Sequence, residues 1–143
     1  MSADRVVEHH LRVRYAETDQ MGVAHHGSYI PWIEEARTEW LRAAGRSYAS
    51  MEREGLVLTV VSVSVRYRRP ARYDDRIRIT TRVLEVGGAS LTFGYELDLV
   101  EREGEEAGYR IAEAETRLGL VDAAGRPRKL PPDLLGAAGP AAG

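Results

Sequence analysis

The sequence predicts an α+β domain in which a curved antiparallel sheet of about five strands wraps around one long central helix. Only residues 28–44 repeat apolar side chains at steps of three and four over a long stretch, as an amphipathic helix does. One alternating segment precedes this helix and four follow it, joined by short turns that favour antiparallel neighbours. The apolar face of the helix must be covered, and a curved sheet would cover it.

The first strand and the helix can be placed from local signals. Alternating apolar and polar side chains over residues 9–15 predict a half-buried strand. Ser28 suits the N-cap of the helix, and Gly45 suits its C-terminal end. We expect a short second helix over residues 47–54.

Four strands are expected in the second half of the chain. Their ranges are 57–68, 77–83, 91–99 and 109–121. The first of them alternates throughout its length, and Gly87 and Gly88 suit the turn after the second. If the strand over residues 56–68 lies at a sheet edge, its free backbone groups would favour pairing with a second copy of the chain.

Length and composition favour one soluble globular domain. The chain has 143 residues, of which 43% are hydrophobic and 29% charged. We assign residues 1–135 to the domain and expect residues 136–143, rich in Gly, Ala and Pro, to form a flexible tail.

The charge and cysteine content exclude several classes of function. A formal net charge of -2 gives no reason to expect nucleic acid or a membrane surface as a partner. There is no cysteine, and the four histidines lack the spacing of metal ligands, so we expect no metal site. No apolar segment has the length of a signal peptide or a membrane span, which favours a cytoplasmic protein.

A polar segment leads into the helix and carries a recognisable motif. It reads Tyr15-x-x-Thr18-Asp19-x-x-Gly22-Val23-x-x-His26-x-x-Tyr29, followed by Glu34-x-Ala36-Arg37. This motif resembles the acyl-CoA thioesterases of the 4-hydroxybenzoyl-CoA thioesterase and YbgC type, and the likeness continues over residues 65–75 and 89–93. The resemblance implies a hotdog fold and hydrolysis of acyl-CoA. It also implies homodimers or homotetramers with the site at the dimer interface, and no cofactor beyond the coenzyme A of the substrate.

The resemblance also assigns roles to single residues. Asp19 matches the catalytic carboxylate, and His26 matches the position whose backbone N–H polarises the thioester carbonyl. Tyr15 matches a tyrosine of the same catalytic site, while His25 departs from the aromatic residue usual at its position. The motif residues Gly22, Val23, His25 and Tyr29 are expected to line the substrate site.

The chemistry of these residue types agrees with that assignment. A carboxylate can attack a thioester as a nucleophile or activate water as a general base. The first N–H groups of a helix have no internal partner, and the helix dipole favours negative charge there. On residue pattern alone, Asp19 could equally be a turn former.

Further choices stay open from the sequence. The basic residues Arg66, Arg68, Arg69 and Arg72 either form a solvated face or contact the phosphates of coenzyme A. Two other functions fit the same fold, namely an enoyl-CoA hydratase or dehydratase and a non-catalytic acyl-CoA-binding dimer. The carboxylate of Asp19 argues against a pure binding role.

Overall fold

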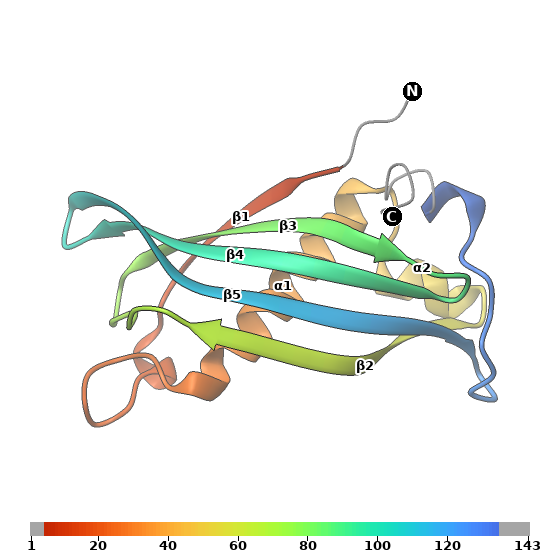
Figure 1. Cartoon of the computed structure of the whole chain (residues 1–143), viewed down its shortest axis with the longest axis horizontal. Helices are drawn as coiled ribbons and strands as arrows, with labels where there is room; N and C mark the ends of the chain where they lie inside the picture. The colour runs from red at the N-terminus through yellow and green to blue at the C-terminus, as the bar shows by residue number, and fades with distance from the viewer. Residues whose placement is uncertain (1–4, 135–143) are drawn as a thin grey trace.

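The computed structural model describes residues 5–134, which form one antiparallel sheet with a helix across it (Figure 1). The sheet has five strands in the order β1-β3-β4-β5-β2. The strands are β1 (Val7–Arg12), β2 (Leu56–Tyr67), β3 (Arg76–Val86), β4 (Ser90–Arg102) and β5 (Glu105–Asp122). The predicted fold class is therefore confirmed, whereas the expected tail over residues 136–143 lies outside the described residues.

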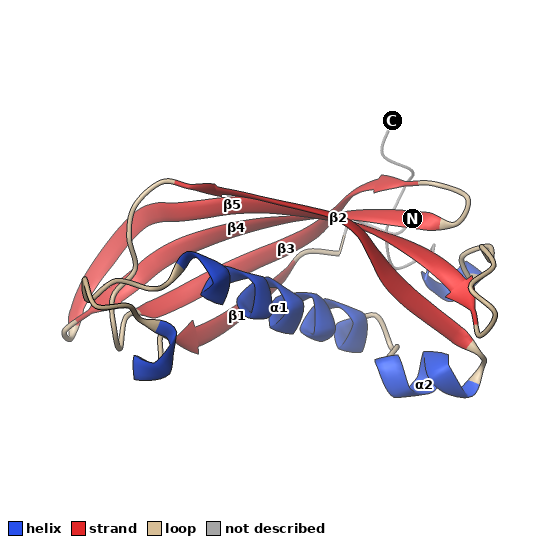
Figure 2. Cartoon of the chain, turned by 90° about the horizontal axis from the view of Figure 1, so that it is seen from below, coloured by secondary structure: helices blue, strands red, loops and turns tan. Residues whose placement is uncertain are grey.

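The helix α1 (Tyr29–Ala43) lies along the concave face of the curved sheet (Figure 2). Ile33, Ala36 and Trp40 recur at helical spacing, so they share one face of the helix, and this face is buried against the sheet. The Trp40 indole meets the ring of Phe93 on β4 edge-on, with ring centroids 5.1 Å apart. At 15 residues the helix is slightly shorter than expected.

Glycine ends this helix as predicted. Gly45 has a φ of +84°, and its N–H donates to the carbonyl of Arg42. The N–H of Arg46 then donates to the carbonyl of Leu41, which closes a typical left-handed C-terminal cap. The short helix α2 (Tyr48–Arg53) follows, as the sequence predicted.

Two local predictions near the N-terminus are wrong. The first strand ends at Arg12, and Tyr15 lies in a 3-10 turn over Tyr15–Glu17 rather than in the strand. Ser28 has helical backbone angles and does not cap α1 with its side chain. Its hydroxyl donates instead to the carbonyl of Glu17, because a further 3-10 turn, His26–Ser28, already starts the helical segment.

A β-bulge at Val61 breaks the alternation expected over residues 57–68. Val60 and Ser62 pair with consecutive residues of β5, so Val61 has no partner of its own. An extra residue reverses the side that all following side chains face. The prediction of unbroken alternation is therefore wrong at this position.

The bulge decides which way the end of β2 faces. Before it, Leu58 packs into the core beneath the sheet. After it, Tyr67 faces α1, since it pairs with Ala112, a residue buried on that side. Without the bulge, Arg66 and Arg68 would point toward α1 and Tyr67 toward the outer surface.

Strand β2 lies at one edge of the sheet, as the sequence analysis considered. Five of its apolar residues remain exposed in a single chain, whereas Leu56 and Leu58 are buried. Those with exposed side chains are Val57, Val60, Val61, Val63 and Tyr67. A long apolar edge with free backbone groups is unusual for an isolated chain.

Candidate active site

The segment before α1 folds into a tight hairpin over residues 17–25. The N–H of Asp19 donates to the carbonyl of Val23 at 2.9 Å, and the N–H of His25 donates to the carbonyl of Glu17 at 2.8 Å. Gly22 closes the turn with a φ of +80°, a conformation that favours glycine. The hairpin is fastened to the β2–β3 connection, because the N–H of Ala24 donates to the carbonyl of Ala71.

Asp19 organises the tip of this hairpin through one carboxylate oxygen. Its Oδ1 accepts the N–H of Met21 at 2.8 Å and that of Val23 at 3.4 Å. Within residues 5–134, Oδ2 has no hydrogen-bond donor, and the side chain is exposed. Asp19 is therefore a turn former, and it also presents a free carboxylate oxygen to solvent.

The start of the helical segment presents one free backbone donor. The Nδ1 atom of His25 accepts the N–H of Gly27 at 3.0 Å, so the His25 side chain caps the turn. The N–H of His26 has no acceptor within the described chain. An unpaired N–H at a helix start is suited to stabilising negative charge on an oxygen.

The two imidazoles lie against each other. The ring centroids of His25 and His26 are 4.1 Å apart, with 33° between the ring planes. The sequence predicted that His25 lines the substrate site, without a defined role for its imidazole; in the structure the side chain caps the turn.

A hollow of about 260 Å³ opens beside this helix start. It is lined by Ala24, His26, Tyr29, Tyr67, Arg68, Arg69 and Pro70. The hairpin, α1 and the end of β2 all contribute, so the hollow joins segments that are far apart in the sequence. Burial raises the pKa of the Tyr29 phenol, which forms one wall of the hollow.

Tyr67 belongs to this site and was missed by the sequence analysis. Its hydroxyl donates to the carbonyl of His26 at 2.8 Å, and its ring meets that of Tyr29 edge-on at 5.0 Å. It falls within the motif segment over residues 65–75, between two of the arginines considered as binding residues. Its place in that segment was the signal that the sequence offered, because alternation alone does not say which side of the strand faces α1.

The arginine cluster predicted from the sequence is divided in the structure. Arg68 is paired with Glu113 at 2.8 Å, and the hydrogen bond from this guanidinium lowers the pKa of Glu113. Arg69 stacks over the ring of Tyr109 at 4.5 Å. Arg68 and Arg69 line the hollow, whereas Arg66 lines a separate one on the outer face of the sheet.

Arg72 has a different place again. It forms an isolated bridge with Val23, and its N–H donates to the carboxylate of Asp75 at 2.7 Å. Its backbone therefore helps to hold the hairpin in place. Val23, predicted to bind substrate, is thus the hairpin residue that pairs with the β2–β3 connection.

Two of the three residues predicted to be catalytic lie away from the hollow, and the predicted binding residues Gly22, Val23 and His25 do not line it either. The side chain of Tyr15 is 77% exposed and contacts Tyr73 edge-on, with ring centroids 5.7 Å apart. Asp19 sits at the tip of the hairpin, opposite Val23, while His26 follows the other end of it. Neither Tyr15 nor Asp19 lines the hollow beside His26 in the single chain.

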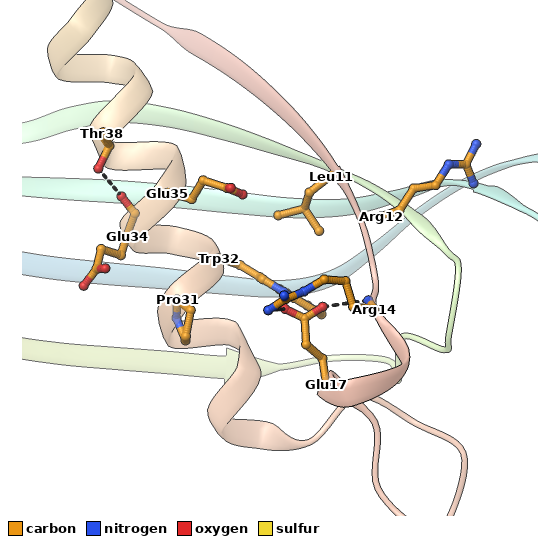
Figure 3. A pocket seen from close by; sticks show the side chains of 9 residues that line it. All are labelled: Leu11, Arg12, Arg14, Glu17, Pro31, Trp32, Glu34, Glu35 and Thr38. Atoms are coloured by element: carbon orange, nitrogen blue, oxygen red, sulfur yellow. Dashed lines mark hydrogen bonds and ion pairs between the residues drawn. The ribbon is translucent and has the colours of Figure 1, made fainter.

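Glu17 anchors the hairpin to the first turn of α1, where Trp32 lies beside it (Figure 3). Its carboxylate accepts the N–H of Arg14 at 2.7 Å and the indole N–H of Trp32 at 3.0 Å. The Glu17 side chain is only 12% exposed. It lines a polar cleft of about 550 Å³ between the end of β1 and α1, shared with Arg12, Glu34 and Glu35 among others.

Residues 5–134 contain no group of three or more His, Cys, Asp or Glu side chains placed to hold a metal ion. None of their helices combines the length and apolar character needed to cross a membrane.

Comparison with known proteins gives the family. The Thioesterase-like superfamily matches residues 13–138, most of the chain. The protein belongs to this superfamily. The acyl-CoA thioester hydrolase YbgC of Escherichia coli O6:H1 is 34% identical over 126 residues, covering 87% of this chain and 90% of YbgC. The predicted resemblance to thioesterases of the YbgC type is thereby confirmed.

Other relatives agree with this assignment of the superfamily. YneP of Bacillus subtilis is 34% identical over 87 residues, a match that spans 61% of this chain and 63% of YneP. The protein TT1821 of Thermus thermophilus has the same fold, with a TM-score of 0.80, 34% identity and coverage of 92% and 95%. A 1,4-dihydroxy-2-naphthoyl-CoA thioesterase from Synechocystis superposes with a TM-score of 0.84 at 20% identity, over 94% and 96% of the chains, which concerns the fold alone.

Proposed function

We propose that this superfamily member is an acyl-CoA thioesterase that hydrolyses its substrate to a free acid and coenzyme A. The observation that carries the proposal is the unpaired N–H of His26 at the helix start, seven residues after a carboxylate with a free oxygen. These two groups are the minimum for thioester hydrolysis, namely a stabiliser for the oxyanion and an activator of the attack.

In the proposed reaction the thioester oxygen accepts the N–H of His26, which draws electrons from the carbonyl carbon. Asp19 then acts in one of two ways. As a general base it takes a proton from water, whose oxygen bonds to the carbonyl carbon, and the C–S bond breaks to release the coenzyme A thiolate. As a nucleophile it bonds to that carbon itself, expels the thiolate and forms an anhydride that water later cleaves.

A second copy of the chain completes the site in this proposal. Asp19 and the hollow beside His26 are separate in one chain, and the exposed apolar strand β2 borders that hollow through Tyr67. Pairing of β2 with its copy would cover these side chains and bring a second set of residues to the hollow. We therefore propose at least a homodimer.

The arginines differ in how available their guanidinium groups are to bind the phosphates of coenzyme A. Arg68 already pairs with Glu113, so its guanidinium is less available to bind a phosphate. Arg69 lies over Tyr109, and no carboxylate within residues 5–134 pairs with it. We propose Arg69 as the main phosphate contact, with Arg66 and Arg68 in lesser roles.

The decisive experiment measures thiol release from short, medium, long and aromatic acyl-CoAs with the wild type and Asp19→Asn. Asparagine keeps an oxygen for the hairpin turn but cannot serve as base or nucleophile, so we expect turnover to fall about 100-fold or more. Asp122→Asn is the matched control, because Asp122 Oδ1 accepts the N–H groups of Ala124 and Arg126 in a similar turn at another site.

The results separate the candidate functions. Loss of turnover in Asp19→Asn, with Asp122→Asn unchanged, would support the proposal. Equal turnover in all three proteins would remove Asp19 from the mechanism. Hydration of an enoyl-CoA without thiol release would favour a hydratase, and binding without any turnover would favour a binding protein.

A further inference from the structure

The helix start is held in place from two sides. On one side, Glu17 accepts the hydroxyl of Ser28 through its carbonyl at 2.9 Å and the indole of Trp32 through its carboxylate. On the other side, the hydroxyl of Tyr67 donates to the carbonyl of His26 at 2.8 Å. Glu17 belongs to the hairpin that precedes the helix start, whereas Tyr67 lies on β2, 41 residues after His26.

The Tyr67 side chain is itself fixed by its surroundings. The bulge at Val61 turns it toward α1, and its ring meets the buried ring of Tyr29 at 87°. Tyr29 in turn packs against Trp32, with ring centroids 4.7 Å apart. A phenol held by its ring can place its hydroxyl with little loss of conformational entropy.

The Tyr67 hydroxyl binds the carbonyl of His26, the same residue whose N–H is unpaired. Holding the carbonyl of His26 restricts rotation of the backbone at that residue, and so restricts the direction of its N–H. Oxyanion stabilisation depends on donors that already point at the reacting oxygen before the reaction starts. Small misplacements of such donors therefore lower the rate more than they lower binding.

We propose that Tyr67 is a positioning residue of the active site, whose hydroxyl keeps the His26 N–H aimed at the thioester oxygen. This inference rests on the proposed thioesterase function. It also links the helix start to the edge strand, so that pairing of β2 with a second copy would stabilise the geometry of the donor.

The test compares steady-state kinetics of Tyr67→Phe and the wild type on the acyl-CoA that the wild type hydrolyses best. Phenylalanine keeps the contact with Tyr29 and removes only the hydroxyl. We expect kcat to fall about three- to tenfold, the range for loss of one neutral hydrogen bond, with KM within about twofold. Affinity for a non-hydrolysable thioether analogue of that acyl-CoA should stay the same.

Tyr48→Phe is the matched control. The Tyr48 hydroxyl accepts a hydrogen bond from Arg37 of α1 at 2.9 Å. This variant therefore also removes one phenol hydroxyl that is hydrogen-bonded to α1, but farther from the helix start. We expect it to lower thermal stability and to leave kcat unchanged. Tyr67→Phe should instead lower kcat and leave thermal stability nearly unchanged, since Tyr67 is 48% exposed.

Each outcome decides the matter. An unchanged kcat in Tyr67→Phe overturns the inference, while wild-type turnover leaves the proposed function standing. A raised KM and weaker analogue binding with normal kcat would make Tyr67 a substrate-binding residue and also overturn it. If the wild type hydrolyses no thioester, the proposed function fails and the inference fails with it.

Discussion

Replacing Val61 with serine on the edge strand β2 is expected to weaken self-association of the protein. The Val61 side chain is 61% exposed in the single chain. Full burial of a valine contributes about 1.5–3 kcal/mol, so covering the exposed part contributes about 1–1.8 kcal/mol. Because a two-fold interface contains the side chain twice, the loss would be about 2–3.6 kcal/mol per dimer. The dissociation constant would then rise about 30- to 400-fold.

Analytical ultracentrifugation over a range of protein concentrations measures this change directly. Leu84→Ser is the control, since Leu84 is 39% exposed but lies on β3, an interior strand. We expect the wild type and Leu84→Ser to sediment as dimers or larger at concentrations where Val61→Ser dissociates. If the wild type is a monomer, or if only Leu84→Ser dissociates, the assignment of β2 as the interface is refuted.

Three further changes test the stability of the fold. Asp75→Asn should lower the free energy of unfolding in urea by about 3 kcal/mol, because buried Asp75 pairs with Arg102 at 2.9 Å and the guanidinium would lose its counter-ion. Gly45→Ala should cost only about 1 kcal/mol in the same assay, since its φ is +84° but a Cβ would meet no atom within 4 Å. Partial burial and the guanidinium of Arg76 lower the pKa of His10 below 6.5. The neutral form of His10 is thus favoured in the fold. The contribution of neutral His10 to the free energy of unfolding is complete above about pH 6.5 and is lost as the pH falls through the folded pKa. In His10→Gln, the melting temperature should depend less on pH in that window.

The local parts of the fold were predictable because their signals are local. Helical spacing of apolar residues located α1, and Gly45 ended it where a left-handed residue was needed. The turn chemistry of Asp19 and Gly22 was also visible, since an aspartate oxygen and a positive φ act within a few residues. The motif spacing then led to the correct family.

The wrong predictions arose where several local solutions were equally good. Ser28 could have capped α1, but its hydroxyl reaches Glu17 because a 3-10 turn precedes the helix. Alternation over residues 57–68 gave no sign of the bulge at Val61, where no glycine or proline marks the extra residue. The bulge instead places Tyr67 on the same side of the sheet as Leu58, which unbroken alternation had put on the opposite side.

By itself, the sequence determined the order of the elements, the end of α1 at Gly45 and the turn chemistry of Asp19, because helical and strand periodicity and turn signals act between near neighbours. Only the tertiary structure decided that β2 lies at the sheet edge, that Tyr67 meets His26 and that Arg68 is paired with Glu113. These contacts join residues more than 40 positions apart. Their partners are chosen by the packing of the whole sheet against α1, and periodicity along the chain carries no information about that choice.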